Sequence, residues 1–413
     1  MKRYITTLAL VLLAAAGFST YYAFGSADHL PEYRLETLEG DVNEAANLVL
    51  VGSYIGGKGS QPLNLTVHGS EYRSRKSLYE SYITDAREWF YEREGMRELI
   101  EKYPAFMRGK SEINSFYQDQ DWLAYAEIPY NSATSDPEGT IEVEMLNRST
   151  GKTADYSIAL TPFTQQGMRE HATLYDVQLQ ADGLHVMVKQ YETDNKPSGA
   201  SQYFDYIIDS ASGQLVKRIA LEFVDAAGTK LTPLSSAATQ NDYTAPNDYF
   251  VLSIVTQEQT GEANSSSVPA NAPAELYVYS YKSGTTQRLP DEMQKLDARR
   301  MGGRYISGGD LYFTNYNETQ FSVSSYSLET GERRGDSWSL LSSQIGEGEL
   351  QSFFINGDRL YVLLAKEDAR TVVVMNAATG ESLYKGSVTV EGSEEERQIA
   401  LSDMALNNMS IKE

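Results

Sequence analysis

The 413-residue chain contains no cysteine. Disulfide bonds, thiolate nucleophiles, Cys-ligated zinc and the lipidated cysteine of a lipoprotein are therefore all excluded. Stability must come from burial of apolar side chains and from strand pairing.

Histidine is also scarce. The four histidines are His29, His68, His171 and His185. None has the His-x-x-x-His or His-Glu-x-x-His spacing of a zinc site, and no Asp-x-Asp-x-Asp-Gly calcium loop is present. His185 lies within an apolar strand pattern and is interpreted as structural, and we expect no metal ion and no cofactor.

Basic residues are outnumbered, with 35 Lys and Arg against 57 Asp and Glu, which gives a formal net charge of -22. A nucleic-acid-binding protein needs a basic footprint that displaces counterions. Nucleic acids and anionic lipid surfaces are therefore not expected partners.

Familiar catalytic motifs are missing as well. Residues 146–153 end in Gly-Lys-Thr, but Leu146 stands where a phosphate-binding loop needs its first glycine. The Ser149-x-x-Lys152 spacing lacks the helix and companion motifs of penicillin-interacting enzymes, and no Gly-x-Ser-x-Gly elbow occurs.

The N-terminus has the layout of a secretory signal. Lys2 and Arg3 precede an apolar run over 8–16, and no charge follows until Asp28. The uncharged stretch is also long enough to cross a bilayer if it stays uncut. We therefore expect residues 1–27 to be a signal peptide or a signal anchor, residues 28–44 to be a linker, and the protein to be extracytoplasmic, either secreted or anchored.

The remaining chain is organised as repeated strand clusters that end in a Ser/Thr-Gly turn. The clearest copies join 357–364 to 371–381 and 309–313 to 323–332, and looser copies start near 122, 184 and 249. The turn glycines are Gly151, Gly213, Gly284, Gly331 and Gly380. The last two intervals, of 47 and 49 residues, indicate the base period, and insertions lengthen the earlier ones.

This period and its short strands predict an all-β fold, a β-propeller of about six to eight four-stranded blades over 45–413. A divergent first copy is expected in 47–51 and 63–69. The last strand could come from the region 399–401 or from residues near Tyr33, and either could close the ring.

The turn sequence Asn/Asp-x-x-Thr/Ser-Gly recurs at 147–152, 209–214 and 376–381. It resembles the outer-strand turn of quinoprotein-like (PQQ-like, YVTN-like) β-propeller repeats. The resemblance implies a fold and no activity. Enzymes of that class usually carry a tryptophan four residues after the turn glycine, where this chain has Asp155, Lys217 and Tyr384.

One segment, 84–107, interrupts the repeats with a helical pattern. Asp85 and Glu88 are spaced as a capping box, and the pattern stops before Pro104. Its apolar positions could bind a partner, or could instead cover the bottom of the propeller or a blade edge. The candidate partner-binding residues are Trp89, Phe90, Met96, Ile100 and Tyr103.

Two functions stay open at this stage. The first is a non-enzymatic propeller that serves as a protein-interaction or sensing module at the cell envelope, with an envelope or membrane protein as its partner. The alternative is a hydrolase or lyase that acts on polysaccharide with carboxylates at the propeller channel. The sequence does not indicate the oligomeric state.

Overall fold

The computed structural model describes most of the chain after residue 29. The described residues are 30–56, 59–72, 94–129, 139–162, 170–192, 201–231, 233–238, 244–256, 274–297, 303–317, 320–346, 348–366 and 369–412.

Six antiparallel sheets of four or five strands account for most of these residues. Sheet 1 has the order β27-β2-β3-β4, with β27 (Met404–Ile411), β2 (Leu48–Gly56), β3 (Gly59–Thr66) and β4 (Gly69–Tyr72). Sheet 2 contains β5 (Phe116–Gln118), β6 (Trp122–Glu127), β7 (Thr140–Asn147) and β8 (Thr153–Ala159). Sheet 3 contains β9 (Glu170–Gln180), β10 (Gly183–Glu192), β11 (Ser201–Ile208) and β12 (Leu215–Ala220).

The second half of the chain repeats the plan. Sheet 4 contains β15 (Pro233–Ala238), β16 (Tyr249–Thr256), β17 (Glu275–Ser280) and β18 (Thr285–Arg288). Sheet 5 contains β19 (Arg304–Ser307), β20 (Asp310–Asn317), β21 (Gln320–Ser327) and β22 (Arg333–Leu341). Sheet 6 contains β23 (Glu349–Asn356), β24 (Arg359–Lys366), β25 (Ala369–Asn376), β26 (Ser382–Val390) and β1 (Tyr33–Gly40).

Shorter elements join the sheets. The hairpin of β13 (Phe223–Val224) and β14 (Lys230–Leu231) lies between sheets 3 and 4 in the sequence. The helices among the described residues are η2 (Val42–Ala45), α4 (Glu94–Lys102), α5 (Pro104–Met107), η4 (Ile113–Ser115), α7 (Asp291–Asp297), α8 (Ser342–Ile345) and α9 (Glu394–Ser402).

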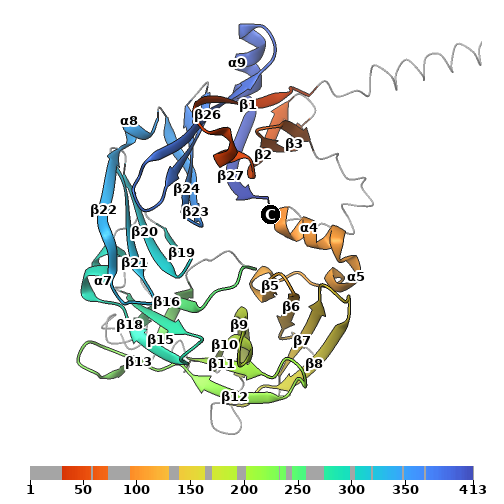
Figure 1. Cartoon of the computed structure of the whole chain (residues 1–413), viewed down its shortest axis with the longest axis vertical. Coiled ribbons are helices and arrows are strands. Elements are labelled where there is room, and N and C mark those ends of the chain that lie inside the picture. Colours follow the sequence, from red (N-terminus) through yellow and green to blue (C-terminus); the bar gives the residue numbers. More distant parts are fainter. Residues whose placement is uncertain are drawn as a thin grey trace, which may run out of the picture.

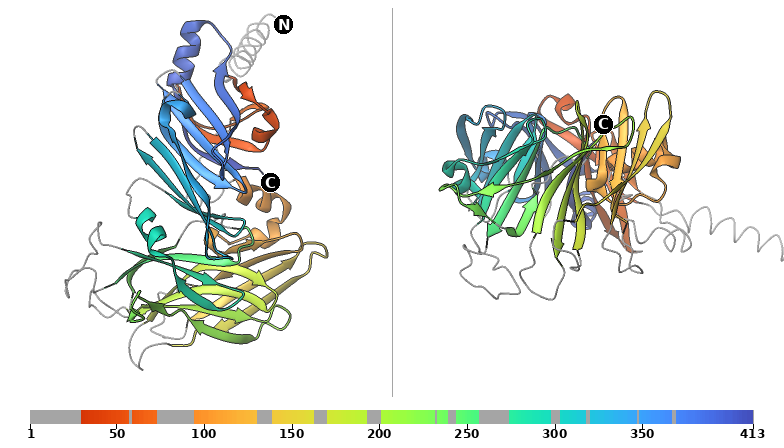
Figure 2. Two further views of the ribbon diagram at one scale, coloured as in Figure 1. Left: turned by 60° about the vertical axis from the view of Figure 1, so that its left-hand side comes forward. Right: turned by 90° about the horizontal axis from the view of Figure 1, so that it is seen from below.

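The sheets follow one another in chain order around a common centre, with α4 lying between sheets 1 and 2 (Figure 1). The view from below shows them standing side by side (Figure 2). The fold is therefore all-β and propeller-like, as predicted from the repeats.

A sheet that lies between two others packs against a neighbouring sheet on both of its faces. Successive side chains of a strand point to opposite faces, so a central strand of such a sheet is apolar on both faces. In β24, Leu360, Val362 and Leu364 pack in a cluster shared with sheet 5. The alternate residues Tyr361 and Leu363 pack in a cluster shared with sheet 1. Clusters of this kind also join sheets 2 and 3, 3 and 4, and 4 and 5.

Both ends of the described chain add a strand to a sheet that the rest of the chain builds. The linker expected over 28–44 is instead strand from Tyr33 to Gly40, and β1 pairs with β26. Tyr33 and Leu35 alternate into the core at 0% and 6% exposure, which explains why the segment is held. Residues 399–401 are helical in α9, and the strand that completes sheet 1 is β27.

The helical segment expected over 84–107 is described from residue 94 onward. It forms α4 and then α5, with Pro104 in the first turn of α5, where its missing N–H costs nothing. The proposed capping pair, Asp85 and Glu88, lies outside the described residues.

Within the described part of the chain, no helix combines the length and the apolar character that crossing a membrane requires. Residues 1–27, where the signal peptide or anchor is predicted, lie outside that part.

Candidate functional site

The helices α4 and α5, here called the α4–α5 unit, are fixed to sheet 2 by a hydrophobic cluster of their own. Met96 and Leu99 of α4 and Phe106 and Met107 of α5 are all at most 4% exposed. They pack with residues of η4 and sheet 2, namely Ile113, Phe116, Leu123, Tyr125 and Leu146. The unit is therefore part of the folded core of sheet 2.

The structure places three of the five candidate partner-binding residues. Met96 is buried in this cluster, whereas Ile100 and Tyr103 are partly buried and pack against it. Trp89 and Phe90 lie outside the described residues. Binding of a partner at this segment stays a prediction, with Ile100 and Tyr103 as its accessible apolar positions.

Polar contacts also hold the α4–α5 unit against sheet 2. The buried Lys110 ammonium pairs with Glu144 of β7 and lies 4.2 Å from the Phe106 ring centroid. The Arg148 Nε donates to the Tyr103 hydroxyl at 3.1 Å. Burial works to raise the pKa of Tyr103, but the hydrogen bond and the charge of Arg148 lower it overall.

A second cluster of polar side chains lies buried between sheets 3 and 4. Asp205 of β11 and Asp176 of β9 both stand opposite Met187 in the sheet register, so all three side chains share one face of sheet 3. His185 lies on the same face two residues before Met187. That face packs against sheet 4 through a cluster that contains Met187 and Tyr279.

His185 is the centre of this buried polar cluster. Its Nδ1 lies 2.7 Å from Asp205 Oδ2, and its Nε2 lies 2.9 Å from Asp182 Oδ1. His185 and Asp205 are both 0% exposed. Burial works to lower the pKa of His185, but the two carboxylates raise it above its usual value.

Two tyrosines of sheet 4 complete the cluster. The Tyr279 hydroxyl donates to Asp205 Oδ2 and the Tyr281 hydroxyl donates to Asp176 Oδ2, each at 2.7 Å. Burial raises the pKa of Asp176, against the opposing hydrogen bonds from Tyr281 and Gln178. Among the described residues, Asp205 Oδ1 is buried without a hydrogen-bond partner.

The segment that leads into β16 ties this cluster to sheet 2. The Asn247 backbone N–H donates to the Gln178 side chain at 2.7 Å, and Gln118 of β5 donates to the Thr244 hydroxyl at 3.1 Å. The Tyr281 backbone N–H donates to the Asp248 carbonyl at 3.0 Å. The segment 244–248 thus contacts β5, β9 and the residue that follows β17.

No protein-family model matches the chain, and no curated protein matches its sequence. Three solved structures illustrate what it is similar to. An uncharacterized protein, lmo1340, from Listeria monocytogenes EGD-e has 11% identity and a TM-score of 0.35, over 66% of each chain. A prolyl endopeptidase has 10% identity and a TM-score of 0.30, over 78% of this chain and 57% of that one.

The β-propeller domain of the trilobed protease from Pyrococcus furiosus has 9% identity and a TM-score of 0.26, over 67% of this chain and 84% of that one. Other similar structures are mostly hydrolases, peptidases and lyases, and the chain spans about half the length of several of them. None of these similarities assigns the repeats to the quinoprotein-like family.

The buried polar cluster is here called the clamp: its ion pair lies within sheet 3, and the hydrogen bonds of Tyr279 and Tyr281 join sheet 3 to sheet 4. A neutral imidazole has one N–H, whereas an imidazolium donates from both nitrogens. Because both nitrogens of His185 face carboxylates, the charged form satisfies both contacts. His185 and Asp205 are both 0% exposed, and the cluster reaches the surface at Asp182, which is 58% exposed.

Sequence reasoning treated His185 as a structural residue but did not find its partners. Asp205 stands between Phe204 and Tyr206, and Asp176 stands before Val177, at positions where the strand pattern expects an apolar residue. A carboxylate at an inward position of a strand was the available signal, because buried charges are normally paired. Within the described residues, no group of three or more His, Asp or Glu side chains is arranged to hold a metal ion.

The five turn glycines share one geometry at the connection between the third and fourth strands of their sheets. Each has a positive φ, between 64° and 74°. Each donates its N–H to the carbonyl four residues earlier, as Gly151 does to Asn147 and Gly380 does to Asn376, both at 2.8 Å. The left-handed conformation explains the glycine in every copy.

Two of these glycines should respond differently to alanine. A Cβ at Gly151 would meet nothing within 4 Å, whereas a Cβ at Gly213 would lie 2.0 Å from the Tyr156 ring. We expect Gly151→Ala to lose about 1–2 kcal/mol of unfolding free energy through the positive φ alone. Gly213→Ala should lose more, since it also displaces Tyr156 from its 2.8 Å hydrogen bond to Ser210. Urea unfolding of the two variants tests this, and equal losses would contradict it.

Proposed function

We propose that this chain is a non-enzymatic, extracytoplasmic β-propeller, anchored or released by its N-terminal segment, that binds an envelope protein at the α4–α5 unit. In this proposal the six sheets form the ring of the propeller. The basic residues before the apolar N-terminal run support this location.

The main support for the proposal is the close packing of the α4–α5 unit on sheet 2. Four apolar side chains and the buried Lys110 hold it in place, so its outer side is a preformed surface. Interfaces of this kind bind without a large ordering cost. The unit carries the partly buried Ile100 and Tyr103 together with exposed charges of both signs, Glu101, Lys102 and Arg108.

The alternative function is a hydrolase or lyase that acts on polysaccharide with carboxylates at the channel, and hydrolysis needs two carboxylates that a sugar can reach. Asp176 and Asp205 come together in the structure, but they are 8% and 0% exposed and lie between two sheets. Such an enzyme would have to use other acids. The similar hydrolases and lyases, at TM-scores of 0.30 or below, carry no argument for it.

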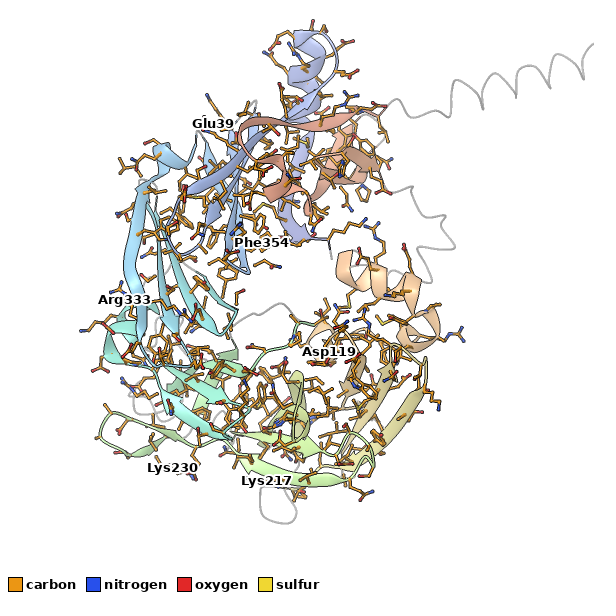
Figure 3. The ribbon with its side chains drawn as sticks, viewed as in Figure 1. Glu39, Asp119, Lys217, Lys230, Arg333 and Phe354 are labelled. Atoms are coloured by element: carbon orange, nitrogen blue, oxygen red, sulfur yellow. The ribbon has the colours of Figure 1, made fainter. Side chains whose placement is uncertain are left out.

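A cross-linked pull-down from native membranes tests the proposal. Deleting the helices would strip the core of sheet 2, so we would reverse two exposed charges instead, in Lys102→Glu/Arg108→Glu. The matched control is Lys152→Glu/Lys217→Glu, and Lys217 lies on the outer side of sheet 3, far from α4 (Figure 3).

We expect a partner in stoichiometric yield with the unchanged chain and with the control, and a loss of about tenfold or more with the first variant. Equal recovery with both variants would refute docking at the α4–α5 unit. Turnover of a polysaccharide in a glycan screen would establish the alternative.

A further inference from the structure

The junction between sheets 1 and 2 differs from the other five junctions around the ring. At each of the others, one cluster contains buried apolar side chains from both neighbouring sheets. The cluster at the α4–α5 unit contains residues of the helices, η4 and sheet 2. Among the described residues, no side chain of sheet 1 belongs to it.

The two faces of sheet 1 show the cause. The face toward sheet 6 is apolar, with buried leucine and methionine side chains that include Leu50, Leu65 and Met409. On the other face, Val49 stands opposite Ser410, and Val51 stands opposite both Asn64 and Asn408. The same strands therefore have a packed side and a largely polar side.

A hydrogen bond joins this second face to α4. With its amide oriented to satisfy both ends, Asn64 accepts a hydrogen bond from Arg97 at 3.1 Å and donates to the Leu63 carbonyl at 3.3 Å. The Ser410 hydroxyl is buried without a hydrogen-bond partner among the described residues. Water can replace contacts of this type at little cost, whereas it cannot replace the apolar packing of the other junctions.

We propose that the ring opens between sheet 1 and α4, with the α4–α5 unit remaining on sheet 2. Met96 and Leu99 keep α4 attached to sheet 2, so the polar contact with sheet 1 is the one that separates. Opening exposes Val49 and Asn64 to solvent while the other junctions stay packed. This opening does not depend on the identity of any binding partner.

Cysteine labelling tests the proposal cleanly, because the chain has no cysteine of its own. Three single variants each replace one buried valine with cysteine. Val49→Cys lies at the proposed opening, at 3% exposure. Val374→Cys and Val186→Cys lie in packed junctions, at 0% exposure each, and serve as matched controls.

The rate of reaction with N-ethylmaleimide would be measured for each variant in native buffer and in low concentrations of urea. We expect Val49→Cys to react about 100-fold faster than the two controls, with a rate that barely changes with urea, because a local opening exposes little surface. The controls should react through global unfolding, with the full urea dependence.

The urea dependence decides the outcome even if a substitution weakens the fold. A Val49→Cys variant that reacts with the same urea dependence as the controls, whatever its absolute rate, reacts through global unfolding, and the proposal is then wrong. A steep dependence for the controls and a flat one for Val49→Cys supports opening at this junction.

Discussion

The His185→Leu variant should lose about 3–5 kcal/mol of unfolding free energy, because it leaves the carboxylate of Asp205 buried without its cation. His185 Nδ1 lies 2.7 Å from Asp205 Oδ2, and both side chains are 0% exposed. Leucine fills a similar volume but supplies no donor. Urea unfolding, monitored by fluorescence and by circular dichroism, measures the loss.

A double-mutant cycle and a surface control separate this effect from general damage. The His185→Leu/Asp205→Asn variant should lose clearly less than the sum of the single losses, because the unpaired buried charge is gone. Asp182→Asn removes the second contact of His185 at a carboxylate that is 58% exposed, so it should cost at most about 1 kcal/mol. Additive single losses would contradict the clamp.

The same pair gives a pH dependence with a definite sign. The pKa of His185 is raised in the folded protein by Asp205 and Asp182, in spite of its burial. A group with a raised folded pKa contributes stability that is fully present below its unfolded pKa, about 6.5 for histidine. That contribution is lost as the pH rises through the folded pKa.

We therefore expect the difference in unfolding free energy between the unchanged chain and His185→Leu to be largest below about pH 6.5. The difference should shrink in alkaline solution. Urea titrations at a series of pH values measure this difference. A difference in unfolding free energy that grows as the pH rises would show that the charged form of His185 does not stabilise the fold.

The repeats were predictable because their signal is local. The turn at 376–381 contains the Asn376 side chain, which accepts from two backbone N–H groups, and Gly380, which takes the positive φ. These requirements are met within six residues, so each copy has a turn glycine and a short polar residue four positions before it. The helical pattern that ends before Pro104 was predictable for the same reason.

Pairings between distant residues left no such trace. Asp205 and Tyr279 are separated by 74 positions, and Asp176 and Tyr281 by 105. Each residue alone fits its strand as an ordinary polar or aromatic position. Only the packing of sheet 3 on sheet 4 brings them together, and a single sequence does not reveal that contact.

The ends of the chain show a further limit of local patterns. The Tyr33 hydroxyl donates to the Ala400 carbonyl at 2.6 Å, across almost the whole chain. The sequence offered the Tyr33 region and the region 399–401 as alternatives for the last strand. The structure uses β1 in sheet 6 and β27 in sheet 1, because each end finds an unpaired edge with a matching apolar face.

Gly52 is a position at which a single methyl group should disturb the pairing of β27, the last described strand, with β2. It lies in β2 opposite Leu406 of β27, where the strand register shifts. A Cβ at Gly52 would lie 2.0 Å from the Ala405 carbonyl oxygen and 2.8 Å from the Leu406 Cα. These are backbone atoms, which cannot rotate away, so β27 must move away from β2.

We expect Gly52→Ala to lose about 3 kcal/mol of unfolding free energy, at the upper end for overpacking, because displacement of β27 also withdraws Met404, Leu406 and Met409 from their cluster. Hydrogen exchange should show faster exchange at the amides of 404–411 than in the unchanged chain. The control is Gly95→Ala, where a Cβ meets nothing within 4 Å and the helix α4 should gain about 0.5–1 kcal/mol. Unaltered exchange over 404–411 in Gly52→Ala would mean that β27 does not depend on its close approach to β2.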